Sequence, residues 1–140
     1  MQINLIQSKT LLTRVSGYLK GVCSHSLNPY GGCGYGLSSC GEGCYVRFNP
    51  WLTRGREWGK FVDVKNNADE LYLQSAEKEK NWAHKRSIPF AIFMSSSTDP
   101  WQPAEKKYRV TRAVLQVMTI SPPDTLILQT HSASILDDQE

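Results

Sequence analysis

Hydrophobic and polar positions follow regular patterns in the second half of the chain, and each pattern predicts one element. The stretch KFVDVK (60–65) alternates apolar and polar side chains, which is typical of a half-buried strand. Residues 66–86 carry a partly apolar stripe at helical i, i+3, i+4 spacing. Asn66 or Asn67 can cap this helix, and acidic residues in its first turn suit the helix dipole. The apolar run at 88–97 predicts a buried strand.

The pattern continues towards the end of the sequence. Residues 106–120 predict a second amphipathic helix, the prolines of 121–124 end it, and 125–132 predict a further buried strand. Alternating strands and helices indicate βαβ units and a parallel sheet, which needs helices on both faces or closure into a barrel. Two or three units give an unfinished barrel. We therefore expect an α/β fold that is the N-terminal part of a longer, partial (β/α) barrel.

The first part of the chain is less regular. Residues 1–17 predict no definite element, and 17–25 suit a short strand. Residues 26–59 are rich in Gly, Pro, Ser and Asn and predict a long loop or several turns. Such long loops are uncommon unless they are functional. We expect one domain over residues 1–140, with a cysteine loop at about 23–59 and βα units at about 60–140.

Composition narrows the function classes. The chain has 140 residues and a net charge of +3, which by itself is too small to imply a nucleic-acid partner. The sequence contains no apolar stretch of membrane-spanning length and no secretory leader pattern, so we expect a cytoplasmic protein with no membrane partner. Thiols stay reduced in that compartment, and clustered cysteines there indicate metal binding or catalysis more than disulfides.

All four cysteines lie in the cysteine loop, and three of them follow a C-x6-C-x3-C spacing: Cys33, Cys40 and Cys44. Thiolates select zinc or iron–sulfur iron, and glycines let a backbone fold closely around either. A cluster with three cysteine ligands would leave one iron open. A zinc ion with Cys23 or His25 as its fourth ligand would be closed and structural. The spacing does not decide between them, and unrelated free cysteines are the third reading.

Three features in order carry a resemblance to a known family: SLNPYGGC (26–33) followed by GCY (43–45), then SSSTDPWQPAE (95–105), then YRVTRAVLQVM (108–118). Together they resemble radical S-adenosylmethionine (radical SAM) proteins related to spore photoproduct lyase. The resemblance implies a [4Fe–4S] cluster held by the three spaced cysteines, with S-adenosylmethionine on its fourth iron. The reduced cluster would cleave this cofactor to a 5′-deoxyadenosyl radical that abstracts hydrogen from a substrate. Cys23 would not be a ligand.

The cysteine spacing departs from the family pattern. That pattern is C-x3-C-x2-C, and here Leu37 and Arg47 stand where it would require cysteine. Arginine cannot bind iron, and three thiols are present. We therefore interpret the loop as carrying an insertion.

The resemblance also implies cofactor-binding residues at the ends of the later strands. Thr98 and Asp99 would reach S-adenosylmethionine or substrate, although a turn with Asp99 as a helix cap explains them equally well. Thr130 and Ser132 would contact the amino acid or ribose of the cofactor, or simply end the last strand. Tyr45 would pack near the adenine, or fill the core. His131 is a candidate proton donor, but a solvated loop histidine is the reading we favour.

Basic and aromatic residues interleave at 51–60 (WLTRGREWGK), a pattern that can bind nucleic acid but more often forms a surface flap over a neighbouring loop. The alternative to the radical SAM enzyme is therefore a zinc-stabilised, non-catalytic binding module, with nucleic acid as its partner. An inactive fragment of the enzyme is a third reading.

Overall fold

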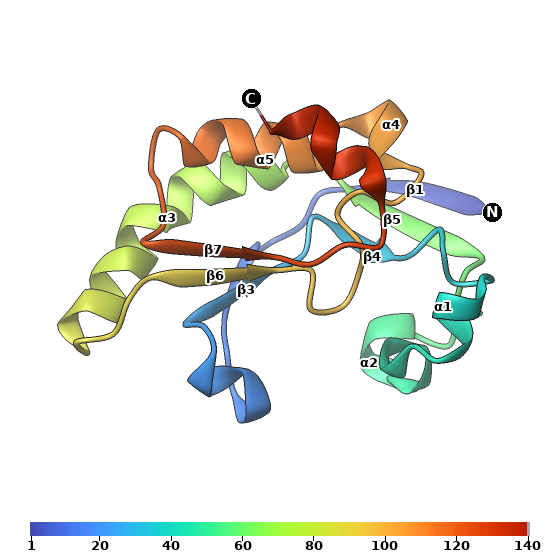
Figure 1. Ribbon diagram of the computed structural model, residues 1–140, viewed down its shortest axis with the longest axis horizontal. Coiled ribbons are helices and arrows are strands. Elements are labelled where there is room, and N and C mark those ends of the chain that lie inside the picture. Colours follow the sequence, from blue (N-terminus) through green and yellow to red (C-terminus); the bar gives the residue numbers. More distant parts are fainter. Residues whose placement is uncertain (140) are drawn as a thin grey trace.

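The computed structural model describes residues 1–139, apart from the side chain of Ser39, and contains two small mixed sheets. The strands of the first sheet lie in the order β1-β5-β4, and those of the second in the order β2-β3-β6-β7 (Figure 1). The strands are β1 (Gln2–Ile6), β2 (Leu12–Arg14), β3 (His25–Leu27), β4 (Tyr30–Gly32), β5 (Phe61–Lys65), β6 (Ala91–Met94) and β7 (Thr125–Leu128).

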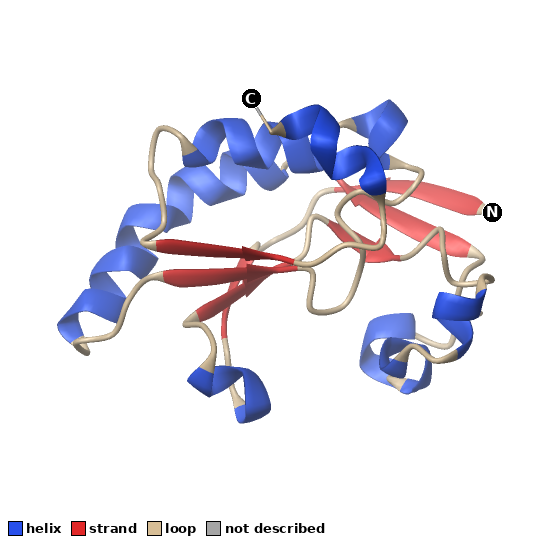
Figure 2. Cartoon of the chain, in the orientation of Figure 1, coloured by secondary structure: helices blue, strands red, loops and turns tan. Residues whose placement is uncertain are grey.

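Helices flank these sheets unevenly. The longer helices α3 and α5 run above the strands, together with α4 and the 3-10 helix η3, whereas short helices lie below them (Figure 2). The upper helices are α3 (Ala68–Lys85), α4 (Glu105–Tyr108), α5 (Val110–Met118) and η3 (Ala133–Asp138). The lower ones are η1 (Gly17–Gly21), α1 (Ser39–Glu42), η2 (Tyr45–Phe48) and α2 (Pro50–Thr53). None of the helices described for residues 1–139 is long and apolar enough to cross a membrane.

The expected partial (β/α) barrel is wrong, although the chain does mix helices and strands. Strand β5 does not join the β3-β6-β7 series. It lies between β1, with which it pairs in parallel, and β4, with which it pairs antiparallel, and these three strands form a separate sheet. Strands β3, β6 and β7 are parallel neighbours, as expected. Strand β2 pairs with β3 in the antiparallel direction and forms the other edge of this sheet. The strands therefore divide between two open sheets, and in the described residues neither sheet closes into a barrel.

The expected helices are present with small changes at their ends. Helix α3 buries Ala68, Tyr72, Ala76 and Ala83, which confirms its predicted face. Asn67 stands at its N-cap position, but the Asn67 side chain bonds the backbone of Ser8 instead of capping the helix. The second predicted helix is split into α4 and α5.

The split falls at Arg109, whose φ of 53° interrupts the helical backbone. The buried carboxylate of Glu105 accepts hydrogen bonds from the backbone N–H groups of Thr111 and Arg112, both at 3.0 Å, and so caps the N-terminus of α5. The same carboxylate accepts a hydrogen bond from the Tyr30 hydroxyl. Burial, followed by the neighbouring Glu105 carboxylate, raises the pKa of Tyr30 far above its usual range, so this hydroxyl stays neutral and donates.

The cysteine loop is more ordered than its composition suggests. It contains β3 and β4 as well as the short helices α1, η2 and α2, so the expectation of a long loop at 26–59 is only partly right. The strand expected over 17–25 is wrong, because 17–21 form the 3-10 helix η1 and the strand begins only at His25. Side chains of β4, β5, α3, β6 and α5 form the main core, whose largest fully buried members include Tyr30, Tyr72 and Phe90.

Candidate functional site

The three spaced cysteines line one cavity of about 440 Å³. The walls are the cysteine loop on one side and the segments that follow β6 and β7 on the other. The lining residues are Cys33, Tyr35, Cys40, Gly43, Cys44, Tyr45, Trp58, Ser95, Ser96, Ser97, Thr98, Asp99, Gln129 and His131. The structure thus places the thiols against the strand ends that the sequence predicted to carry polar site residues.

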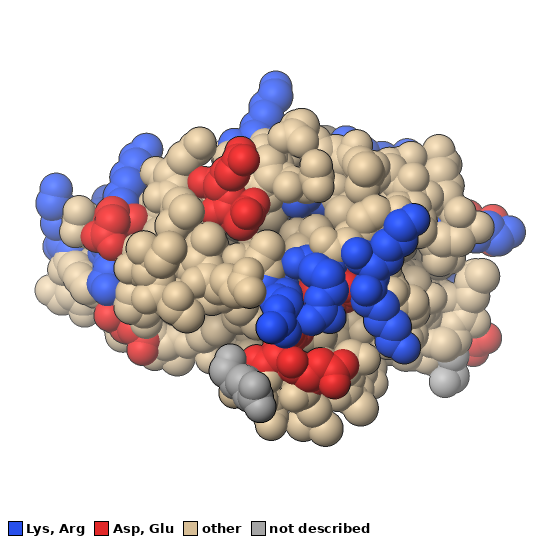
Figure 3. Space-filling view, turned by 90° about the horizontal axis from the view of Figure 1, so that it is seen from above, with Lys and Arg blue, Asp and Glu red and all other residues tan. Residues whose placement is uncertain are grey.

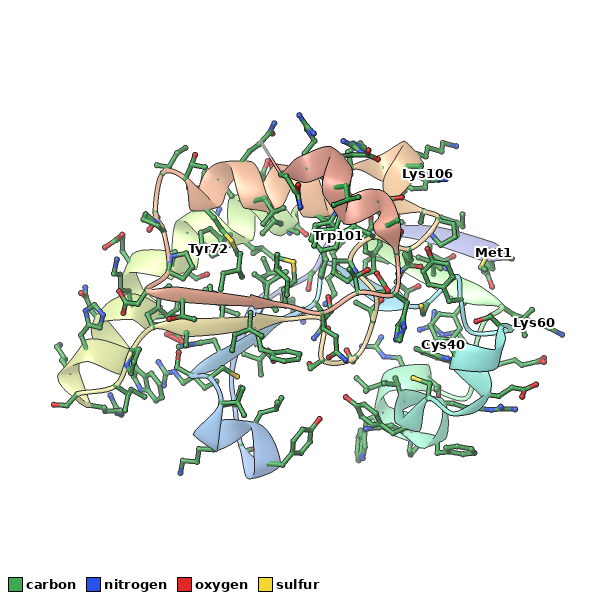
Figure 4. All side chains as sticks on the ribbon, viewed as in Figure 1. Met1, Cys40, Lys60, Tyr72, Trp101 and Lys106 are labelled. Atoms are coloured by element: carbon green, nitrogen blue, oxygen red, sulfur yellow. The ribbon has the colours of Figure 1, made fainter. Side chains whose placement is uncertain are left out.

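The three thiols differ in their surroundings. Cys33 directly follows β4 and is 9% exposed, Cys40 is exposed on α1, and Cys44 is half-buried before η2. Figure 4 shows Cys40 on the short helix α1, below the β4–β5 side of the molecule. Burial raises the pKa of Cys33 to about 11, so this thiol is protonated at neutral pH when no metal is bound.

The thiols share a cavity but are not gathered as ready-made ligands. Within residues 1–139, no three His, Cys, Asp or Glu side chains lie close enough together to hold a metal ion. The described arrangement therefore does not by itself form a metal site.

The other two candidate ligands lie elsewhere. Cys23 is buried beside η1, where its thiol contacts the Leu19 carbonyl oxygen. The ring of His25 is fully buried, with Ser24 Oγ 2.8 Å from Nδ1 and Glu79 Oε1 3.3 Å from Nε2. Neither residue is part of the cavity lining. The structure does not bring either residue to the other three cysteines, as a four-ligand zinc site would require.

Glycines allow the cysteine loop to fold back on itself. A Cβ atom on Gly41 would lie 1.9 Å from the carbonyl oxygen of Gly36, and one on Gly36 would lie 2.4 Å from the Cα atom of Gly59. Gly59 also has a φ of 89°, which glycine adopts without strain. These three glycines therefore bring α1, the turn after Cys33 and the segment before β5 into backbone contact. This contact places Cys40 near the cavity.

The segment 98–105 binds the cysteine loop from the opposite wall. The Thr98 hydroxyl donates to the carbonyl oxygen of Gly32 at 2.5 Å, and the Gln102 amide accepts from the Gly34 N–H at 2.8 Å. Gln102 also donates to the carbonyl oxygen of Gly32 at 3.3 Å and to the Thr98 hydroxyl at 3.0 Å. Thr98 lines the cavity, and its hydroxyl is hydrogen-bonded within the protein.

Asp99 ties the two strand ends together. Its buried carboxylate accepts hydrogen bonds from the Thr130 hydroxyl at 2.6 Å, from the His131 N–H at 2.8 Å and from the Trp101 N–H at 2.9 Å. Asp99 therefore reaches the cavity from a fixed position. Thr130 and Ser132 are not among the lining residues. Thr130 instead holds Asp99, and Ser132 caps the N-terminus of η3.

Two further lining residues, His131 and Tyr45, are both exposed. His131 is exposed, which fits the solvated loop histidine that we favoured from the sequence. Tyr45 is 55% exposed, and its hydroxyl donates to the backbone carbonyl of Ser96 and lies 3.4 Å from the Tyr18 hydroxyl. Tyr45 thus connects the cysteine loop to the segment after β6 and does not fill the core.

The sequence places Ser95 and Gln129 among the polar residues that follow the two later strands but indicates no role for either, and both also line the cavity. Ser95 is buried, its backbone has a φ of 87°, and its hydroxyl has no hydrogen-bond partner among the described residues. A strained non-glycine residue at a cavity is often part of a functional site. No local sequence signal marks this serine, because it is one of three in a row.

Part of the basic and aromatic segment 51–60 packs against the rest of the protein, and most of its residues are exposed. Arg56 forms a forked ion pair with Asp63, at 2.9 and 2.8 Å, and its guanidinium lies 3.8 Å above the ring of Phe61. Trp58 is 6% exposed and packs beside Cys33, whereas Trp51 is 86% exposed. This arrangement matches the surface-flap interpretation of the segment.

Charged side chains elsewhere pair with each other. Arg109 and Arg112 both contact the Asp138 carboxylate, at 3.3 and 2.7 Å, and the Trp101 indole donates to the same group at 2.8 Å. Figure 3, which views the molecule from the side of α5 and η3, shows basic and acidic side chains next to one another on that face. Trp101 lies beneath η3 in Figure 4.

Comparison with known proteins identifies a distant relative. The chain is 32% identical over 115 residues to an uncharacterized protein of Methanocaldococcus jannaschii, and the alignment covers 81% of this chain. It covers 38% of that protein, so the chain spans well under half the length of this relative. No family model matches the chain, and no solved structure matches it.

Proposed function

We propose that the cavity binds a [4Fe–4S] cluster and S-adenosylmethionine, and that the chain carries the cofactor-binding part of a radical SAM enzyme. The observation that carries this proposal is the placement of Cys33, Cys40 and Cys44 around one cavity, opposite the polar ends of β6 and β7. When bound, the reduced cluster supplies an electron that cleaves S-adenosylmethionine to methionine and a 5′-deoxyadenosyl radical.

The type of donor fits such a cluster, but in the described residues the three thiols are not grouped closely enough to hold a metal ion without a local rearrangement. Thiolates are the ligands that iron–sulfur clusters use. The glycines of the loop, which have no Cβ atoms, allow its backbone segments to lie close together. The unpartnered Ser95 hydroxyl adds a polar group for a ligand in the same lining. Cys23 and His25 lie outside the lining, and this separation favours a three-cysteine cluster over a closed zinc site.

The remaining residues have separate tasks in this proposal. Tyr45, Thr98 and Asp99 line the cavity and would border S-adenosylmethionine. Thr130 and Ser132 would act indirectly, because Thr130 holds Asp99 and Ser132 caps η3 behind the cavity wall. The protein thus contributes binding, orientation and exclusion of water.

Anaerobic reconstitution with ferrous iron and sulfide tests the proposal. We expect about four iron atoms per chain and a brown protein whose reduced form gives a [4Fe–4S] electron paramagnetic resonance signal. Dithionite with S-adenosylmethionine should then yield 5′-deoxyadenosine. Cys40→Ala should lower the iron content, whereas the control Cys23→Ala should not. A protein that takes up about one zinc and no iron under these conditions would contradict the proposal.

A further inference from the structure

Cys33 is the most enclosed of the three cavity thiols, and its position depends on the peptide groups beside it. The preceding carbonyl belongs to Gly32 and the following N–H belongs to Gly34. Both groups are bound by one side chain, the Gln102 amide, at 3.3 and 2.8 Å. Gln102 is fully buried, so water does not compete for these bonds.

The amide group is well suited to this task. It carries a donor and an acceptor at opposite corners of one plane, and a carbonyl and an N–H on either side of one residue satisfy both. The Thr98 hydroxyl adds a second donor to the Gly32 carbonyl and also accepts from the Gln102 amide. This network fixes the orientation of the Gln102 side chain.

The backbone around Cys33 has two further restraints: Gly32 pairs with Val62 between β4 and β5, and the Cys33 carbonyl accepts a hydrogen bond from the Gly36 N–H at 3.0 Å. Gly32 has a φ of 74°, and a glycine in this conformation has a wide choice of alternatives when its partners are lost. Gly34 follows Cys33 directly, so the thiol is flanked by two flexible residues. Loss of the Gln102 bonds would free the Gly34 N–H and leave the Gly32 carbonyl with the Thr98 hydroxyl alone from this wall, so the peptide groups beside Cys33 could rotate and shift the thiol.

We propose that Gln102 is a positioning residue for Cys33: its amide holds the peptide groups on both sides of this cysteine and keeps the thiol turned into the cavity. The clamp joins the cysteine loop to the segment after β6, so it also sets the distance between the two walls of the site. Its role in metal binding rests on the proposed function, whereas its effect on the thiol does not.

The rate at which the Cys33 thiol is alkylated reports how firmly Gln102 holds it, and the measurement needs no cofactor. The metal-free protein is treated with N-ethylmaleimide under reducing conditions, and mass spectrometry follows each cysteine-containing peptide. Cys23 is also buried but lies outside the cavity, so its rate reports general loosening of the fold. The ratio of the Cys33 rate to the Cys23 rate isolates the local effect.

We expect Gln102→Leu, which keeps the volume but removes the three hydrogen bonds of the amide, to raise this ratio about tenfold. Thr98→Val, which removes only the hydroxyl, should raise it about threefold. The control Gln116→Leu, at an exposed position on α5, should leave it unchanged. If Gln102→Leu does not fold, the Thr98→Val ratio decides the outcome.

An unchanged ratio in the folded variants would overturn the inference. Reconstitution of the same proteins then separates the two proposals. A raised ratio together with a lowered iron content in Gln102→Leu supports both. If the ratio is raised but the wild-type protein binds no iron, the positioning role of Gln102 is supported and the proposed function is refuted.

Discussion

The contact between Gly41 and Gly36 provides a sharp test of how the cysteine loop is built. In Gly41→Ala the new Cβ atom would lie 1.9 Å from the Gly36 carbonyl oxygen and 2.2 Å from its carbonyl carbon. Ordinary contact begins at 3.4 Å, so α1 or the facing turn must move by about 1.5 Å. Both obstructing atoms are backbone atoms and cannot rotate away.

The expected cost follows from two opposing effects. Forcing an extra methyl group into close-packed backbone costs about 1 to 3 kcal/mol. Alanine is preferred over glycine within a helix by about 0.5 to 1 kcal/mol, which offsets part of that cost at this position in α1. We therefore expect Gly41→Ala to lower the free energy of unfolding by about 1 to 2 kcal/mol.

Gly43 provides the control because it differs in this one respect. A Cβ atom there meets nothing within 4 Å. Its φ of −90° suits alanine. Gly43→Ala should therefore be neutral, or should stabilise the fold by up to about 1 kcal/mol by restricting the unfolded chain.

Urea-induced unfolding, followed by far-ultraviolet circular dichroism, measures both variants against the wild type. The midpoint should fall for Gly41→Ala and stay or rise for Gly43→Ala. After reconstitution, Gly41→Ala should also bind less iron, because α1 carries Cys40. Equal midpoints for the two variants would refute the close contact and with it the explanation for the glycines.

Three further predictions concern the framework around the site. Glu105→Ala should lower the free energy of unfolding by about 2 to 4 kcal/mol in urea melts, because it removes the cap of α5 and leaves the buried Tyr30 hydroxyl without its partner. A loss below about 1 kcal/mol would contradict this. Burial lowers the pKa of His25 below 6.5 even though Glu79 favours the charged form, so the unfolded chain binds a proton that the folded chain does not. Stability should therefore fall as the pH drops below about 6.5, and urea melts at about pH 7.5 and about pH 5.5 should show this loss in the wild type but not in His25→Phe. Asp99→Ala should speed hydrogen exchange at the His131 amide by at least about tenfold, and an unchanged rate would show that the carboxylate does not hold this segment.

Local patterns in the sequence predict a good part of this fold. The helical stripe of α3, the alternation of β5 and the apolar runs of β6 and β7 depend on neighbours a few positions apart, so these elements are readable directly. The predicted burial of β7 is wrong, because β7 lies at the edge of its sheet and its residues are half-buried or exposed. The division into two sheets is not readable in this way. Strand β1 pairs with β5 about 60 positions later, and its Ile3 and Leu5 are exposed at a sheet edge, which removes the usual burial pattern.

The candidate site shows the same limit. The cysteines stand out because four thiols fall in one glycine-rich stretch, and three of them line one cavity; their role as ligands stays a prediction. The polar residues of 98–105 were expected as a turn with cofactor contacts. Their partners lie far away in sequence, since Gln102 bonds Gly34 across 68 positions. Nothing local in a proline-rich turn shows that its glutamine and glutamate are buried.

The segment 98–105 has a consequence for how the protein opens. Binding loops usually belong to the least stable parts of a protein and unfold locally while the core stays intact. Here one short segment connects the cysteine loop, the end of β7, the start of α5 and the buried Tyr30. Local melting of either cavity wall would thus disturb the core as well. The cavity walls and the core should therefore unfold as one cooperative unit.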